Sequence, residues 1–454
     1  MTSKARNTEH LTPWVLGVAV LLQTLDATSV AVALPAIAVD LQRDTLAVSA
    51  TISAYLLGAA ASVPPCGWLA DRFGGRNVFL LGILSFVLAS VACAMAPSLH
   101  VLLVARFTEG AAGALLLPVG RMVIMRTFAA DERVRAYTTF VLPALLGPML
   151  GPLVGGMLVE YASWRWIFLL NVPLGLCSLL AVSLLLGNFR ETQPRKMDLL
   201  GMLITSLALL VFVLGLIMLS RALWQVGTIA VALGLLLGVL AVAHAWHHEH
   251  ALLQLSLLRS PLFRRALGTD LCCRLLMNAA PVLLSLLLQS RLGLSPSLTG
   301  ILIVMIAVGS LLTKPYTYRW LDRYGCREVM ASSTVLAALA FISCALLTPT
   351  SSPWLIGALL LAFGFFRSLT ISATAVMIFH GVAPEDTGAA TTLSAIGQQV
   401  FQVMGLTGVT ILMQLSGGQH PSTVTIAEAI VVSGLLSLTA LYFIFRIGPV
   451  TLRP

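Results

Sequence analysis

The chain has 454 residues, of which 58% are hydrophobic and only 10% are charged. A soluble domain carries about 25% charged residues, so this composition indicates a membrane bundle and not one large soluble core. The long apolar segments are apolar on all sides and do not alternate with polar residues, which argues against a transmembrane β-barrel. We therefore expect an all-α polytopic membrane protein.

The formal net charge is +9, which in a soluble protein would suggest a nucleic-acid partner. Here the basic residues fall in short loops between apolar segments, as the positive-inside rule requires, so we expect no nucleic acid to bind. The seven cysteines lie mostly inside apolar segments and include no CxxC pair. We expect neither a disulfide framework nor a metal site.

Fourteen stretches of about 20 mostly apolar residues are long enough to cross a bilayer as helices. They lie near residues 12–34, 49–70, 77–96, 100–125, 136–159, 164–187, 199–219, 224–245, 265–289, 298–318, 328–348, 353–378, 388–414 and 425–446. With the N-terminus inside, 18 of the 27 basic residues fall in cytoplasmic loops and four fall outside. This asymmetry predicts that both ends of the chain are cytoplasmic.

One short motif occurs twice in the chain. Residues 71–76 and 322–327 both read D-R-aromatic-G-x-R, 251 residues apart, and each follows the second predicted helix of a half. We therefore expect two homologous six-helix bundles, in residues 1–190 and 263–454. Residues 191–262 would hold two inserted central helices and their linkers.

The first copy of this motif, GWLADRFGGR at residues 67–76, resembles the loop between helices two and three of the major facilitator superfamily. In that family the loop latches the two halves on the cytoplasmic side. Gly67 permits close helix contact, and Asp71 can meet a helix N-terminus or a nearby arginine. The residues that the resemblance assigns to the latch are Gly67, Asp71, Arg72, Gly74 and Arg76, with Asp322 and Arg323 in the second copy.

Asp26 lies deep in the first apolar segment, within LDATSVAVALP at residues 25–35. This stretch resembles the first-helix signature of the 14-span drug:proton antiporters, although Ala31 stands where that signature often carries Asn. A carboxylate at this depth is costly unless it pairs, faces water or takes up a proton. Asp26 is therefore the candidate proton-coupling residue, and a structural carboxylate bonded to a neighbouring helix is the alternative.

Arg106 lies in LVARFTEGAAG at residues 103–113, which resembles the fourth-helix motif of the same family. Glu109 replaces the more frequent glutamine of that motif and shares a helix face with Arg106, three residues away. An intramembrane arginine almost always faces the bundle interior. We expect Arg106 and Glu109 to join Asp26 in proton coupling, and a purely local Arg106–Glu109 pair is the alternative.

The stretch GPMLGPLVGG at residues 147–156 resembles the fifth-helix motif that marks exporters in the family. Two Gly-Pro pairs and a stripe of small residues allow close packing and a bend. Residues 118–122 and 160–168, taken as a pair, resemble the MdtD-like branch of the 14-span antiporters. The motif residues are Gly147, Pro148, Gly151, Pro152, Gly155 and Gly156.

The C-terminal half also carries charged residues inside apolar segments, namely Asp270, Arg274, Lys314 and Arg367. Asp270 and Arg274 are four residues apart and can neutralise each other. We expect the substrate cavity to be lined by Arg106, Arg274, Arg367 and Asp270. A cavity with several arginines favours anionic or zwitterionic cargo over lipophilic cations.

The resemblance covers nearly the whole chain and implies a proton-coupled antiporter, not an enzyme, that exports drugs or toxic amphiphiles by alternating access. It would act as a monomer in the bacterial inner membrane, with a small-molecule substrate and protons as its partners. No GxxxxGK[ST] phosphate loop occurs, so we expect no ATPase module and no cofactor besides the proton gradient. The alternative is an exporter of an anionic metabolite or of a metal chelate such as a citrate-type carboxylate.

Overall fold

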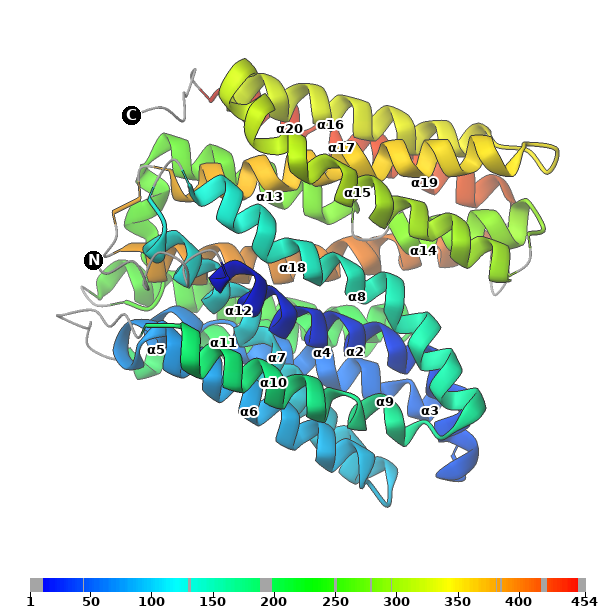
Figure 1. Cartoon of the computed structure of the whole chain (residues 1–454), viewed down its shortest axis with the longest axis horizontal. Helices are drawn as coiled ribbons and strands as arrows, with labels where there is room; N and C mark the ends of the chain where they lie inside the picture. The colour runs from blue at the N-terminus through cyan, green and yellow to red at the C-terminus, as the bar shows by residue number, and fades with distance from the viewer. Residues whose placement is uncertain are drawn as a thin grey trace. The chain divides into compact units, whose positions relative to one another are not determined.

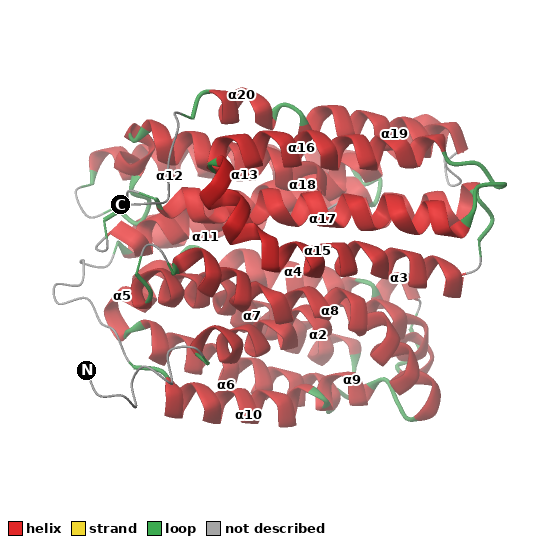
Figure 2. Cartoon of the chain, turned by 45° about the horizontal axis from the view of Figure 1, so that its top comes forward, coloured by secondary structure: helices red, strands yellow, loops and turns green. Residues whose placement is uncertain are grey.

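The computed structural model describes residues 11–43, 45–129, 132–187, 198–248, 251–277, 280–294, 296–380, 382–383, 386–417 and 423–447. Within these ranges the chain is helical and contains no β-strand (Figure 1, Figure 2). The first-half helices are α2 (Thr12–Asp40), α3 (Thr45–Val48), α4 (Ala50–Ser62), α5 (Cys66–Phe73), α6 (Gly75–Ala94), α7 (Leu99–Thr127), α8 (Arg133–Tyr161), α9 (Arg165–Leu169) and α10 (Asn171–Leu185). The later helices are α11 (Leu199–Ser220), α12 (Trp224–His247), α13 (Pro261–Met277), α14 (Ala280–Leu286), α15 (Pro296–Tyr324), α16 (Cys326–Ser343), α17 (Pro353–Phe379), α18 (Thr387–Gly417), α19 (Thr423–Ser437) and α20 (Ala440–Phe445).

Every predicted apolar stretch coincides with one of these helices or with a consecutive pair. Among the described residues, ten helices are long and apolar enough to cross a membrane, and two bent pairs raise that number to twelve. The bends are 55° between α4 and α5, and 42° between residues 135–148 and 153–161 of α8. Large apolar side chains such as Leu184, Leu203 and Leu235 are exposed on the outer helices, as a protein surrounded by lipid requires.

Two of the fourteen predicted spans, near 265–289 and 388–414, are not among these twelve. The first coincides with α13 and α14, and residues 278–279 between these helices lie outside the described part of the chain. The second coincides with α18, whose hydropathy is lowered by Gln398, Gln399 and Gln402. The all-α membrane fold is confirmed, and the number of fourteen spans stays a prediction.

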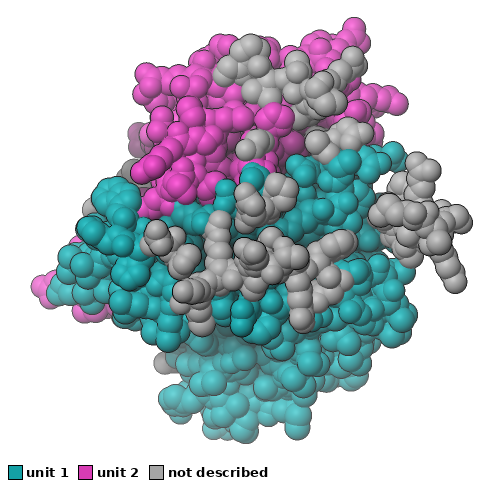
Figure 3. Space-filling model, turned by 90° about the vertical axis from the view of Figure 1, so that its left-hand side faces the viewer, with its two compact units in different colours: residues 1–215, 229–254, 383–396 teal, residues 216–228, 255–382, 397–454 magenta. Residues whose placement is uncertain are grey.

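The chain forms two compact units (Figure 3). Unit 1 contains residues 1–215, 229–254 and 383–396, and unit 2 contains residues 216–228, 255–382 and 397–454. α18 is one continuous helix whose first part, up to Ile396, belongs to unit 1. The predicted division into bundles at residues 190 and 262 follows sequence order and stays a prediction.

In unit 1, α4 and α7 approach each other through a reciprocal pair of glycines. A Cβ atom added to Gly58 would lie 1.9 Å from the carbonyl oxygen of Phe107. A Cβ atom added to Gly110 would lie 2.0 Å from the carbonyl oxygen of Tyr55. Both distances are far below van der Waals contact and involve backbone atoms, so this crossing accepts no larger residue.

Unit 2 repeats this crossing between α15 and α17. Added Cβ atoms at Gly309 and Gly364 would each lie 2.0 Å from a carbonyl oxygen of the facing helix. Gly309 follows Gly58 by 251 residues, the same offset that separates the two copies of the repeated motif. Gly74 and Gly325 within those copies also share a positive φ, 88° and 84°, that favours glycine.

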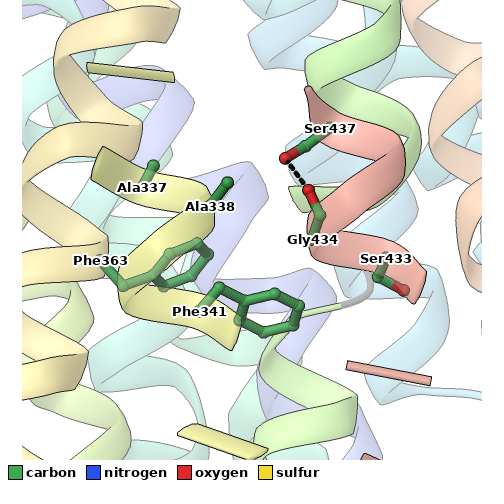
Figure 4. Close-up of a pocket in the computed structure, with 7 residues that line it drawn as sticks. All are labelled: Ala337, Ala338, Phe341, Phe363, Ser433, Gly434 and Ser437. Atoms are coloured by element: carbon green, nitrogen blue, oxygen red, sulfur yellow. Dashed lines mark hydrogen bonds between the residues drawn. The ribbon is translucent and has the colours of Figure 1, made fainter. Parts of the chain in front are cut away.

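Unit 2 also packs α16, α17 and α19 around a small gap (Figure 4). The rings of Phe341 and Phe363 stack with their centroids 5.1 Å apart. On α19, the hydroxyl of Ser437 donates to the carbonyl oxygen of Gly434. The gap has a volume of about 10 Å³, barely enough for one water molecule, so it is a packing defect and not a substrate site.

Asp198 fastens the start of α11 to the end of α12 within unit 1. Its carboxylate accepts hydrogen bonds from the backbone N–H groups of Gly201 (2.8 Å) and Leu252 (2.9 Å). Nε2 of His244, in the last turn of α12, lies 2.8 Å from Oδ1. Burial favours the neutral acid, but the backbone donors and His244 outweigh it and hold the pKa of Asp198 below its ordinary value.

Candidate functional site

Asp26 of α2 and Arg106 of α7 meet inside unit 1, as the sequence predicts. Nη1 of Arg106 lies 2.6 Å from Oδ2 of Asp26 and also 2.6 Å from Oε2 of Glu109. At most 1% of each of these three side chains is exposed. One guanidinium nitrogen therefore bridges two carboxylates in a site that is closed to solvent.

Two neutral polar residues that the sequence did not single out also belong to this cluster. The hydroxyl of Ser90, on α6, donates to Oε1 of Glu109 at 2.5 Å. The amide of Asn171, at the start of α10, donates at 3.2 Å to both Asp26 and Ser90. The only signal for them was a polar side chain inside an apolar stretch, which is common and names no partner.

Two aromatic rings lie near the guanidinium of Arg106. Its Cζ lies 4.5 Å from the ring centre of Tyr55 and 5.6 Å from that of Phe168. Such contacts stabilise a cation that has been removed from water. Two carboxylates against one guanidinium leave an excess of one negative charge, so uptake of one proton makes the cluster neutral. In an apolar interior, the neutral cluster has a lower free energy than the charged cluster.

The predicted exporter motif lies directly against α2, the helix that carries Asp26, and α2 and α8 run alongside each other (Figure 1). Added Cβ atoms at Gly147 and Gly151 would each lie 2.0 Å from a hydroxyl oxygen, that of Thr24 and of Thr28 respectively. The hydroxyl of Ser29 donates to the carbonyl oxygen of Gly151 at 2.9 Å. The glycines thus allow a close contact that α2 hydroxyls then bridge.

The rest of the exporter motif is less uniform. Gly155 faces α2, because an added Cβ atom would lie 2.9 Å from the carbonyl oxygen of Ser29. Gly156 has more room, and Pro148 is exposed. The side chain of Pro152 lies outside the described part of the chain. The sequence had indicated a glycine stripe, but not that Thr24, Thr28 and Ser29 would be its partners.

Asp71 of the predicted latch meets both kinds of partner that the sequence indicated, an arginine and a helix N-terminus. Nη2 of Arg126 lies 2.8 Å from Oδ1 of Asp71, and both side chains are largely buried. An added Cβ atom at Gly388, in the first turn of α18, would lie 2.3 Å from Oδ2 of Asp71. The N–H of Gly67 donates to the hydroxyl of Thr392 at 3.1 Å. Within unit 1, Asp71 therefore lies at the positive N-terminus of α18.

The other predicted latch residues are spread out. Arg76 donates at 2.5 Å to the carbonyl oxygen of Ser183, near the end of α10. The side chains of Arg72 and Arg323 are exposed, and Arg323 lies over the ring of Tyr324. Asp322 is partly buried. Only Gly67 and Asp71 among them meet α18 through contacts that the described residues establish, and the latch role stays a prediction.

We expect Asp71→Asn and Arg126→Gln each to destabilise the protein by about 1–3 kcal/mol, because each leaves the other side chain without its buried partner. The double variant should unfold no earlier than the worse single variant. Thermal unfolding of the four purified proteins in detergent measures this. Strictly additive losses would mean that the Asp71–Arg126 pair contributes nothing to stability.

A second buried carboxylate, Asp270, lies in unit 2 where α13, α17 and α18 meet. Its Oδ2 accepts from Nε of Arg274 and from the amide of Gln398, both at 2.9 Å. Its Oδ1 accepts from the hydroxyl of Thr374 at 3.3 Å. The pair of Asp270 and Arg274 follows the predicted spacing, whereas Thr374 and Gln398 were not predicted.

Two further cations of unit 2 lack a carboxylate partner in the described part of the chain. Nζ of Lys314 donates to the neutral hydroxyl of Ser372 at 2.9 Å, and this lysine is only 9% exposed. Nε of Arg367 is buried and has no hydrogen-bond partner among the described residues. Sequence reasoning had placed Arg367 in the substrate cavity; its side chain is partly buried, and the cavity role stays a prediction.

The membrane-spanning helices and the enclosed charges define a polytopic α-helical transporter. The chain belongs to the Major Facilitator Superfamily, whose model matches residues 16–260 and 269–454. "Putative multidrug resistance protein MdtD" of Serratia proteamaculans is 32% identical over 92% of this chain and 87% of its own length. "Probable transport protein HsrA" of Haemophilus influenzae is 34% identical over 88% of this chain and 87% of its own length. These relatives confirm the predicted family.

Solved structures show the same fold at low sequence identity. The human organic anion transporter MFSD10 superposes with a TM-score of 0.72 at 14% identity, over 96% of this chain and 99% of its own. The proton:xylose symporter XylE superposes with a TM-score of 0.69 at 12% identity. Both confirm the major-facilitator fold of the chain.

Proposed function

We propose that this chain is a proton-coupled antiporter that exports small molecules of the drug or toxic-amphiphile class across the bacterial inner membrane by alternating access. The two curated relatives carry names of multidrug resistance and transport proteins. Family membership supports a small-molecule substrate, and the MdtD-type relatives support the export of drugs.

The observation that carries the proton coupling is the sharing of one Arg106 nitrogen by Asp26 and Glu109. This cluster alternates between a charged form and a neutral form by the gain or loss of one proton. Asp26 is the residue whose pairing can change, because its helix differs from that of Arg106, whereas Glu109 stays three residues away on the same helix. In alternating access, the proton then biases the inward and outward states.

The orientation rests on the distribution of basic residues. With both termini in the cytoplasm, the latch around Asp71 lies on the cytoplasmic side, and the loops there carry most of the lysines and arginines. The Gly147–Gly151 contact with α2 is consistent with the exporter motif, because it fixes the helix that carries the coupling carboxylate.

The test uses everted membrane vesicles that contain the full chain and are acidified by respiration. We expect an amphiphilic dye to release protons from these vesicles, and vesicles without the chain to release none on the same addition. Release of the gradient by citrate and by no amphiphile would instead establish the export of small carboxylates. Absence of release with every compound, from a folded protein, would contradict proton-coupled export.

A further inference from the structure

Three arginines gather at the end of unit 2 where α13 and α16 begin and α20 ends. Arg265 lies near the start of α13, Arg327 is the second residue of α16, and Arg446 directly follows α20. Because α20 packs against both α13 and α16, the three side chains surround the end of this short helix. No carboxylate in the described part of the chain forms an ion pair with any of them.

The internal repeat shows why two of these arginines keep donors available. In unit 1, Arg76 of the first motif copy donates to the carbonyl oxygen of Ser183, near the end of α10. Arg327 is the counterpart of Arg76, 251 residues later, and α10 and α20 each belong to the last predicted span of a half. At the end of α20, however, Arg265 donates to the carbonyl oxygen of Arg446. Among the described residues, none accepts a hydrogen bond from the guanidinium of Arg327 or of Arg446.

These two guanidiniums lie over aromatic rings of α20 instead. Cζ of Arg446 is 4.3 Å from the ring centre of Tyr442, and Cζ of Arg327 is 5.7 Å from that of Phe445. The two rings are three residues apart on one face of α20, and more than half of each side chain is exposed. The aromatic contacts therefore hold two cations within about one helical turn of each other. A stacked guanidinium still presents the N–H groups at its edge to a further partner.

The position of this face indicates the kind of partner that fits it. The ends of membrane spans lie near the lipid headgroups, where exposed aromatic residues are enriched. The preceding helix, α19, exposes the apolar side chains of Val432, Leu435 and Leu436. A soluble anion would leave this apolar surface uncovered. A phospholipid covers both parts, with its phosphate at the arginines and its acyl chains on the apolar side chains.

We propose that Arg327 and Arg446 bind the phosphate of an anionic phospholipid, such as phosphatidylglycerol, at the end of α20. A guanidinium offers a planar fork of donors that matches a phosphate, and Arg265 adds a third positive charge beside it. A zwitterionic lipid brings its own ammonium group, which the three arginines repel. The binding of a lipid here needs no transport, so it holds or fails independently of the exported substrate.

The test uses the full chain, purified in a neutral detergent and incubated with phosphatidylglycerol and phosphatidylethanolamine of identical acyl chains. Native mass spectrometry measures the lipids that remain bound. We expect phosphatidylglycerol to bind preferentially, and Arg327→Gln and Arg446→Gln each to weaken its binding by about 10-fold. Arg327→Lys should keep part of the binding, because it keeps the charge but not the fork.

Arg319→Gln is the matched control, because Arg319 is an exposed arginine near the end of α15, and this variant should bind the lipid as wild type. An equal loss of binding in the control would mean that the lipid responds to total charge and would overturn the site. Equal binding of both lipids by the wild type would overturn it as well.

A second measurement separates a lipid from a soluble phosphate. Dioctanoyl phosphatidylglycerol should raise the unfolding temperature of the wild type, and inorganic phosphate at the same concentration should not. An equal rise with both would mean that the arginines bind a soluble anion, which contradicts the lipid site.

Phe445→Leu keeps the test decisive if a glutamine variant fails to fold. It removes the ring beneath Arg327 and leaves every charge in place, so lipid binding should weaken by about threefold. Unchanged binding of phosphatidylglycerol by all the folded variants would show that the lipid binds elsewhere, and the proposal would be wrong.

Discussion

Asp26→Asn should lower proton-driven export by about 100-fold or more while the protein stays folded. Asparagine keeps the shape of the side chain and still accepts a hydrogen bond from Arg106, but it cannot carry a proton. The remaining pair of Arg106 and Glu109 already has no net charge, so the apolar surroundings do not favour the uptake of a proton. The measurement is substrate-induced proton release from everted vesicles, set against substrate exchange without a gradient, which should persist.

Asp40→Asn is the matched control for this experiment. Asp40 is the same residue type on the same helix, but it lies at the end of α2 in an exposed pair with Arg165. We expect it to transport as wild type. Normal proton-coupled export by Asp26→Asn, at equal protein levels, would remove Asp26 from the mechanism and leave it as a structural carboxylate.

The buried charges were the part of the site that the sequence could predict. A charged side chain inside an apolar helix is costly, so Asp26, Arg106 and Asp270 stood out without any structure. The pairs within one helix, Arg106 with Glu109 and Arg274 with Asp270, followed from spacing alone. The helical spans could also be predicted from the sequence, because each span needs only its own stretch of apolar residues.

What the sequence could not give was the pairing of different helices. Ser90 and Asn171 reach Glu109 and Asp26 only because α6 and α10 pack against α7 and α2. Thr392 was one of many threonines in an apolar stretch, and nothing local indicated that it would bind Gly67. A neutral polar side chain costs little free energy inside a helix bundle. Its presence in an apolar stretch therefore does not indicate which residue it contacts.

The close contacts of helical glycines could not be predicted either, because a glycine in a helix does not indicate which backbone it will contact. Of the residues that line the α4–α7 crossing, Gly110 fell within a motif that the sequence indicated, but Gly58 did not. The structure shows that these glycines define the closest approach of the two helices. It also places Tyr55, which covers Arg106, at the same crossing.

Gly110→Ala should therefore destabilise the protein by about 1–3 kcal/mol or more, because the new methyl group has to push the backbone of α4 away. That shift displaces the ring of Tyr55 from Arg106, so proton coupling should weaken as well. Gly238→Ala is the control: it makes the same change in α12, where an added Cβ atom meets nothing within 4 Å. Because alanine is favoured over glycine within a helix, this control should be neutral or slightly stabilising. Thermal unfolding in detergent compares the two, and an equal unfolding temperature for both variants would mean that α4 and α7 do not cross this closely.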